Sequence, residues 1–137
     1  MNSMKQYEIL EHKADLKIRA FGKTKEELFL NAMIGMFKGA RYESEGEEIK
    51  REIKISSLDL PSLLVDFLSE VLYLCEVNKE VYNKIQFKNS IEKELEGILI
   101  GKKLKRIGVV IKGVTYHNLK IYQRKNRTWV ATVLFDI

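Results

Sequence analysis

The strongest constraint on the fold comes from residues 129–137, because their strand pattern is apolar on both faces. Every second side chain from Trp129 to Phe135 is apolar, and so are two of the three between them. A strand of this kind must be covered on both sides, so we expect it to lie inside a sheet. A strand inside a sheet cannot fray at little cost, which should hold the carboxylates of Asp136 and Ile137 in place.

Two segments have the apolar spacing that is typical of helices. The first is expected to begin after Thr24, which forms a capping box with Glu27, and to stop at Gly39. The second is expected from about residue 59 to about residue 77, with Pro61 tolerated in its first turn. One face of this second helix is apolar, and the other carries Asp66, Ser69, Glu70 and Tyr73.

The remaining patterns alternate with period two, which predicts strands. A polar segment at residues 41–50 is expected to be a loop. Two helices and about eight strands predict an α+β fold, in which two helices pack on mostly antiparallel β-sheets in a two-layer sandwich. The expected strands span residues 6–10, 16–21, 49–55, 82–88, 90–101, 106–114, 118–124 and 128–136.

Length and composition predict one ordered domain over residues 1–137. The chain is 45% apolar and has no linker or low-complexity tract. No apolar run approaches the roughly 20 residues of a membrane span, and the first residues lack the apolar core of a signal peptide. We therefore expect a cytoplasmic protein that does not bind membranes. The only cysteine, Cys75, excludes an internal disulfide, and its apolar surroundings predict a buried thiol.

Positive charge is concentrated in the second half of the chain. The net charge is +5, yet residues 88–127 alone carry eleven Lys and Arg against three Glu. Such a bias attracts phosphate backbones or anionic protein surfaces. Lysines on solvated edge strands, where they discourage aggregation, would produce the same pattern. The aromatic signature of common RNA-binding domains is absent from the sequence, so both interpretations stay open.

The most informative chemistry is a set of carboxylates at strand ends. The sequence has no phosphate-binding loop, dinucleotide fingerprint, nucleophile elbow or His-Glu-x-x-His motif. Asp15 is expected at the start of the second strand, and Asp136 and the α-carboxylate of Ile137 end the last one. If these ends meet, their oxygen ligands suit a hard divalent cation. The alternative is that Asp15 caps a turn and Asp136 is merely solvated.

Four blocks of this sequence resemble the archease family, in the same order and with matching spacing. The most specific features are the HxAD turn, the acidic and aromatic second helix, the VTYHNLK block and the Asp-Ile ending. The blocks are EILEHKADLKIRAFGKTKEELFLNAMIGMF, LLVDFLSEVLYL, IKGVTYHNLKI and TWVATVLFDI.

The resemblance implies a compact α+β fold and a function as a protein cofactor rather than an enzyme. Archeases act as partners of a GTP-dependent tRNA-splicing RNA ligase, promoting guanylylation of its active-site histidine and multiple turnover. Contact with tRNA would then be indirect or weak. The metal site of the family, usually described as calcium, maps onto Asp15, Asp136 and Ile137. Magnesium or manganese would be alternative cations.

Two departures from the family pattern bear on this site. Lys13 stands where the family usually has Thr, which would lower cation affinity, and the stretch between Gly101 and Ile111 is shorter than usual. Secondary candidates for partner binding or for support of the site are His12, Glu70, Lys112 and His117, with Tyr73 beside them. Plainer alternatives stay open: a solvated helix residue for Glu70, contact with water for Lys112, and a hydrogen-bonded imidazole in a turn for His117.

Two other functions remain open on the sequence alone. One is a basic tRNA-binding module or chaperone that holds tRNA halves through residues 88–127. The other is a metal-dependent hydrolase, for which His12 is the only candidate base near the carboxylates in sequence.

Overall fold

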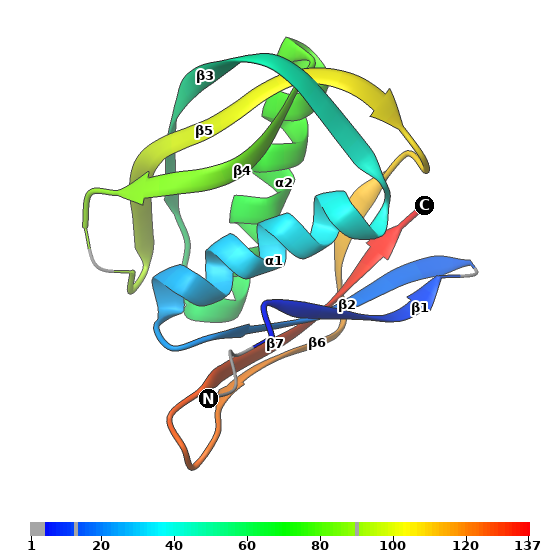
Figure 1. Ribbon diagram of the computed structural model, residues 1–137. Helices are drawn as coiled ribbons and strands as arrows, with labels where there is room; N and C mark the ends of the chain where they lie inside the picture. Colours follow the sequence, from blue (N-terminus) through cyan, green and yellow to red (C-terminus); the bar gives the residue numbers. More distant parts are fainter. Residues whose placement is uncertain (1–4, 13, 90) are drawn as a thin grey trace.

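The computed structural model describes residues 5–12, 14–89 and 91–137, in which two helices and seven strands form two antiparallel sheets (Figure 1). The four-stranded sheet has the order β1-β2-β7-β6, and the three-stranded sheet has the order β3-β5-β4. The elements are β1 (Tyr7–His12), β2 (Asp15–Gly22), α1 (Lys25–Gly39), β3 (Tyr42–Ser56), α2 (Leu60–Asn78), β4 (Glu80–Phe87), β5 (Glu94–Ile107), β6 (Gly113–Gln123) and β7 (Trp129–Asp136).

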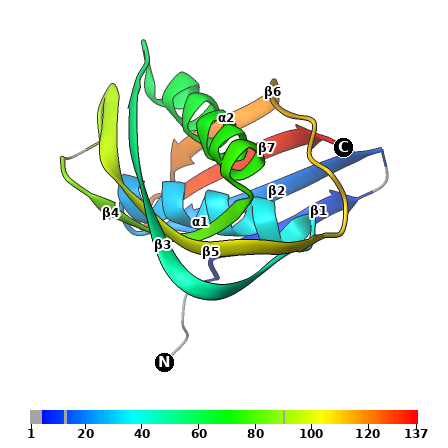
Figure 2. The same cartoon turned by 90° about the horizontal axis from the view of Figure 1, so that it is seen from above.

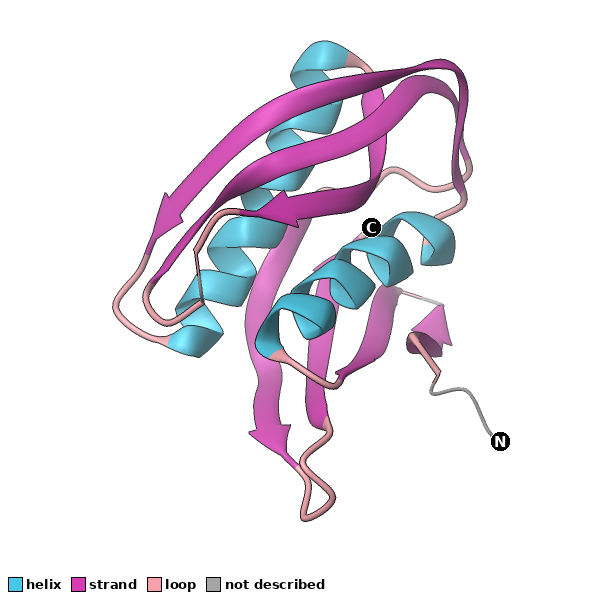
Figure 3. Cartoon of the chain, turned by 60° about the vertical axis from the view of Figure 1, so that its left-hand side comes forward, coloured by secondary structure: helices cyan, strands magenta, loops and turns pink. Residues whose placement is uncertain are grey.

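The helices lie between the two sheets. Both contact strands of the four-stranded sheet on one side and of the three-stranded sheet on the other, as Figures 2 and 3 show from two directions. Their buried side chains join those of both sheets in one continuous apolar core. The predicted α+β class, with two helices packed on antiparallel sheets, is therefore confirmed. The helices form a layer of their own between the sheets, so the fold has three layers where two were expected.

Both helices begin where predicted, α1 after the predicted cap Thr24 and α2 after Asp59, which the structure adds as its cap. The hydroxyl of Thr24 accepts a hydrogen bond from the Glu27 backbone N–H at 3.1 Å, and the Glu27 carboxylate accepts one from the Lys23 backbone N–H at 3.0 Å. At the start of α2, the Asp59 carboxylate accepts from the Ser62 backbone N–H at 2.9 Å. These bonds satisfy backbone donors that have no partner inside the helix, which is why these residue types begin helices.

The C-terminal strand has the predicted interior position. β7 pairs with β2 on one side and β6 on the other, and Val130 and Phe135 are fully buried. No helix in the described ranges is both long enough and apolar enough to cross a membrane.

The predicted polar loop at residues 41–50 is wrong, because this segment is the first part of β3. It pairs with β5 although most of its side chains are exposed. The ladder places Glu43 opposite Arg106 and Glu48 opposite Lys102. Opposite charges across a ladder are favourable, so an exposed strand without apolar alternation is stabilised by its neighbour.

The predicted strand at residues 106–114 is also wrong. Residues 108–112 connect β5 to β6, and their backbone N–H groups bond to scattered acceptors rather than to one strand. Val109 N–H donates to the carbonyl of Ala40 at 2.9 Å, and Ile111 N–H donates to the Tyr42 hydroxyl at 3.1 Å. Residues 113–123 then form one strand, β6, where the sequence had suggested a break.

Candidate functional site

Asp15 and Asp136 lie directly opposite each other at one end of the four-stranded sheet. They are register partners in the antiparallel β2-β7 pair, and Gly113 of β6 is opposite Asp136 on the other side. Directly paired residues project from the same face with Cβ atoms about 4.5–5.5 Å apart. The carbonyl of Asp136 accepts a hydrogen bond from the Lys112 backbone N–H at 2.7 Å, which holds this end of β7.

The donor chemistry of this pair fits a hard cation. Asp136 is exposed and Asp15 is partly exposed, and neither forms an ion pair with another described residue. Like charges opposite each other are unfavourable unless a cation is shared between their oxygens. Ile137 follows directly, and its side chain packs against the core, which fixes its position near the pair.

The described side chains supply only part of a complete coordination sphere. Within the described ranges, no three His, Cys, Asp or Glu side chains come together as a metal-binding group. A calcium ion takes six to eight oxygen ligands. The two carboxylates therefore suit an ion that also binds water or groups of another molecule.

Two of the sequence candidates cannot be placed in this site. The backbone of His12 pairs with that of Leu16 in the β1-β2 ladder. The His12 side chain and the whole of Lys13 lie outside the residues that the structure describes.

Lys112 and His117 have different relations to the carboxylate pair. Lys112 precedes β6 and is bonded to Asp136 through its backbone, so it is close to the pair in the fold. His117 is exposed on β6, where the register with β7 shifts between Thr115 and Lys120. Its backbone N–H donates to the Thr115 hydroxyl at 3.1 Å, so His117 belongs to an irregular strand segment rather than the predicted turn.

Glu70 lies on the outer side of α2 in a shallow hollow of about 520 Å³. Lys54, Asp66 and Tyr73 also line this hollow, and none of its lining residues belongs to β2 or β7. The structure therefore does not bring Glu70 into the carboxylate site.

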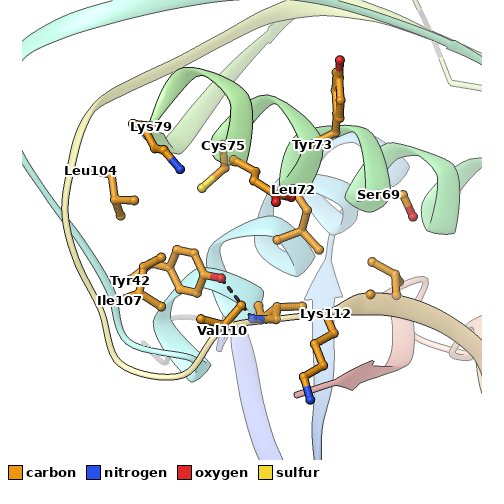
Figure 4. Close-up of a pocket in the computed structure, with 14 residues that line it drawn as sticks. Tyr42, Ser69, Leu72, Tyr73, Cys75, Lys79, Leu104, Ile107, Val110 and Lys112 are labelled. Carbon is orange, nitrogen blue, oxygen red and sulfur yellow. Dashed lines mark hydrogen bonds between the residues drawn. The ribbon is translucent and has the colours of Figure 1, made fainter.

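A larger cavity, which sequence reasoning did not identify, lies between α2 and the segment leading to β6 (Figure 4). Its volume is about 720 Å³, within the range of ligand-sized pockets. We call it the α2 hollow. It is lined by Tyr42, Ser69, Leu72, Tyr73, Cys75, Glu76, Lys79, Leu104, Ile107, Val110, Ile111, Lys112, Gly113 and Val114. The one sequence feature that could have indicated this cavity is Tyr73, a large aromatic residue on the helix face that is otherwise polar.

Burial suppresses ionisation in the floor of the α2 hollow. Cys75 is buried, as predicted, and this burial raises the pKa of its thiol to about 11. Burial also raises the pKa of the Tyr42 hydroxyl, which accepts the Ile111 N–H. Both groups therefore stay neutral well above pH 7 and add no charge to the floor of the hollow.

A second polar feature lies away from the carboxylate pair, on the three-stranded sheet. Arg51 donates to both carboxylate oxygens of Glu80 at 2.8 Å, and the Tyr82 hydroxyl donates to the same carboxylate at 2.9 Å. The guanidinium of Arg51 holds the pKa of the buried Glu80 carboxyl below its ordinary value. Such a fully bonded buried carboxylate is a structural element rather than a free ligand.

Comparison with curated proteins finds archeases over nearly the whole chain. A protein from Methanosarcina mazei is 40% identical over 142 residues, covering 97% of each chain. One from Methanosarcina barkeri is 42% identical with the same coverage. A protein from Pyrococcus furiosus is 32% identical and covers 98% of this chain and all of the relative.

Two solved structures have the same fold. The solution structure of Methanobacterium thermoautotrophicum protein 1598 has a TM-score of 0.71 and 27% identity, covering 98% of this chain and 100% of that one. The crystal structure described as an archease, possible chaperone, from Thermotoga maritima has a TM-score of 0.70, 22% identity and full coverage of both chains. The model of the Archease protein family (MTH1598/TM1083) matches residues 7–137. With this match and relatives more than 30% identical over nearly all of their length, the chain belongs to the archease family.

Proposed function

We propose that this chain is a protein cofactor of a GTP-dependent RNA ligase in tRNA splicing and itself catalyses no reaction. In this function it promotes guanylylation of the active-site histidine of the ligase and supports repeated turnover, in the cytoplasm. The resemblance to archeases suggests this partner, and the carboxylate pair offers a physical means of acting on it.

The observation that carries the proposal is the register that sets Asp15 opposite Asp136. The two side chains would bind a divalent cation, with the α-carboxylate of Ile137 as a third donor. Calcium is favoured because its large, flexible coordination sphere tolerates a partial set of protein oxygens. A bound cation would supply positive charge that neutralises phosphate oxygens during nucleotidyl transfer. Asp15 and Asp136 would orient that charge toward the ligase.

The decisive experiment is a single-turnover guanylylation assay of the ligase. We expect this chain to accelerate guanylylation with calcium and to lose that effect with a chelator. Asp15→Asn and Asp136→Asn should abolish the acceleration without unfolding the chain. Asp59→Asn is the matched control, because Asn caps a helix as well as Asp and the lost carboxylate lies at α2. Full acceleration by both site variants would refute the proposal.

The role of Ile137 has a separate test. Two glycines added after Ile137 would move the α-carboxylate away from Asp136 while leaving β7 intact. We expect weaker calcium binding, measured by calorimetry, and weaker acceleration of guanylylation. Unchanged binding would remove Ile137 from the ligand set and leave the two aspartates in place.

A tRNA-binding chaperone is the alternative function. The Thermotoga maritima structure, which is described as a possible chaperone, is compatible with it. The β3-β5 ladder argues against a tRNA-binding role, because the acidic residues of β3 neutralise part of the basic half of the chain. Arg106 pairs with Glu43 at 3.4 Å, and Lys105 approaches Glu45 at 4.0 Å. Direct tRNA binding that weakens steeply with salt would favour the chaperone. Little affinity for tRNA in the absence of ligase would favour the cofactor.

A further inference from the structure

We propose that the α2 hollow is the docking site for an apolar, carboxylate-bearing segment of the ligase. This inference rests on the proposed function, and it adds the surface and the kind of segment through which the ligase would be held. The carboxylate pair would then act on a partner that binds mainly elsewhere.

Apolar surface is concentrated around the hollow. Tyr73 is 57% exposed and Val110 is 59% exposed, and both line it, with Ile107 beside them. In Figure 4 the Tyr73 ring projects outward from α2, on the side away from Tyr42 and Val110, while Leu72 and Cys75 face the interior. Large aromatic residues beside a pocket are the usual anchors of protein interfaces. Within the described residues, nothing in the chain fills this space.

Lys79 offers the hollow a cation without an ion-pair partner among the described residues, and this cation suits a carboxylate on a partner. Two cations, Lys79 and Lys112, stand against one carboxylate, that of Glu76, and neither lysine forms an ion pair with another described residue. Figure 4 shows the Lys79 ammonium directed into the hollow toward Cys75, and the Lys112 ammonium directed away from α2. Lys79 is therefore positioned to pair with a carboxylate on an inserted segment.

The hollow adjoins the end of β7 that carries Asp136. Gly113 lines the hollow and is the register partner of Asp136, and the Lys112 N–H is bonded to the Asp136 carbonyl. A partner that reaches a cation at Asp15 and Asp136 therefore meets the rim of the hollow. One interface can span both features, with apolar anchoring in the hollow and chemistry at the carboxylates.

The test measures the affinity of the intact ligase for variants of this chain by calorimetry. Tyr73→Ala, Val110→Asp and Lys79→Asn should each weaken binding about tenfold or more, and Asn keeps the left-handed cap of α2 at this position. Because all three side chains are exposed, thermal unfolding should be unchanged. Two exposed residues outside the hollow provide matched controls. Tyr122→Ala on β6 and Leu58→Asp before α2 should bind like the wild type.

The outcomes separate this inference from the proposed function. Weakened binding by the three hollow variants, with normal binding by the two controls, supports docking in the hollow. Normal binding by the hollow variants overturns it and leaves the cofactor function standing. Absence of binding by the wild type overturns both. A wild-type dimer in light scattering that Val110→Asp dissociates would show that a second copy covers the hollow, which also overturns the inference.

Discussion

Asp15 and Asp136 begin one strand and end its neighbour, so that two carboxylates face each other across the β2-β7 ladder. Without a cation this arrangement should cost stability, because like charges directly opposite in a sheet repel. A divalent cation bound between the two carboxylates, as proposed, would relieve this repulsion.

The first prediction is therefore that calcium reverses which protein is more stable, the wild type or Asp15→Asn. In chelator, Asp15→Asn should raise the free energy of unfolding by about 0.2–1 kcal/mol, since it removes the repulsion. Calcium at about 100 times its Kd should stabilise the wild type by about 2.7 kcal/mol and the variant far less. Chemical unfolding with and without calcium measures both effects. Equal calcium stabilisation of the two proteins would count against a site at this pair.

The second prediction concerns Glu80 and pH. Arg51 depresses the pKa of Glu80 below its ordinary value of about 4.5, so the charged carboxylate stabilises the fold. This contribution is complete above about pH 4.5 and is lost as the pH falls through the lower pKa of the folded state.

Glu80→Gln should therefore destabilise the protein at pH 7, by about 1–3 kcal/mol. The difference from wild type should shrink as the pH falls below about 4.5. Urea unfolding across this range measures it. Glu52→Gln, on an exposed position of β3, is the control and should have little effect. A Glu80→Gln difference that does not vary with pH would contradict the assignment.

A third prediction compares two glycines. A Cβ on Gly101 would overlap the Val81 carbonyl oxygen on the neighbouring strand, whereas a Cβ on Gly113 would meet nothing within 4 Å. Gly101→Ala should destabilise the fold by about 1–3 kcal/mol or more, because the β4 backbone must move. Gly113→Ala should be neutral or slightly stabilising. Thermal unfolding of the two variants tests this, and similar losses in both would show that strand geometry is not the cause.

The fourth prediction is low reactivity of Cys75. Burial raises its pKa from 9.0 to about 11, which lowers the thiolate fraction at pH 8 by about two orders of magnitude. Iodoacetamide should therefore label the native protein at least about 100-fold more slowly than the urea-unfolded chain. Labelling rates that differ only by a small factor would mean that the floor of the α2 hollow opens readily.

The helices and the interior strand could be predicted because their signals are local. The Thr24 and Asp59 caps and the doubly apolar pattern of β7 each lie within a few neighbouring residues. The two errors have non-local causes. Residues 43–48 are exposed and acidic, and only the lysines and arginine of β5, about sixty residues later, make them a strand. Residues 108–112 alternate like a strand, but their hydrogen-bond partners lie in the turn after α1, at the start of β3 and in β7.

The candidate site could be predicted only in part. The sequence pattern predicts that Asp15 and Asp136 lie at strand ends. That the two residues are paired directly depends on the register of strands far apart in the chain. The α2 hollow could not be predicted, because it is formed by the packing of one helix against a connection that looked like a strand.

The interior place of β7 also affects how a growing chain folds on the ribosome. β2 and β7 are neighbours although roughly a hundred residues separate them, so this contact has a high sequence separation. The nascent β1-β2 hairpin can form early, yet one of its edges stays open until β7 emerges. Stalled or shortened translation products would present that edge to other chains, which makes late synthesis the stage most prone to aggregation.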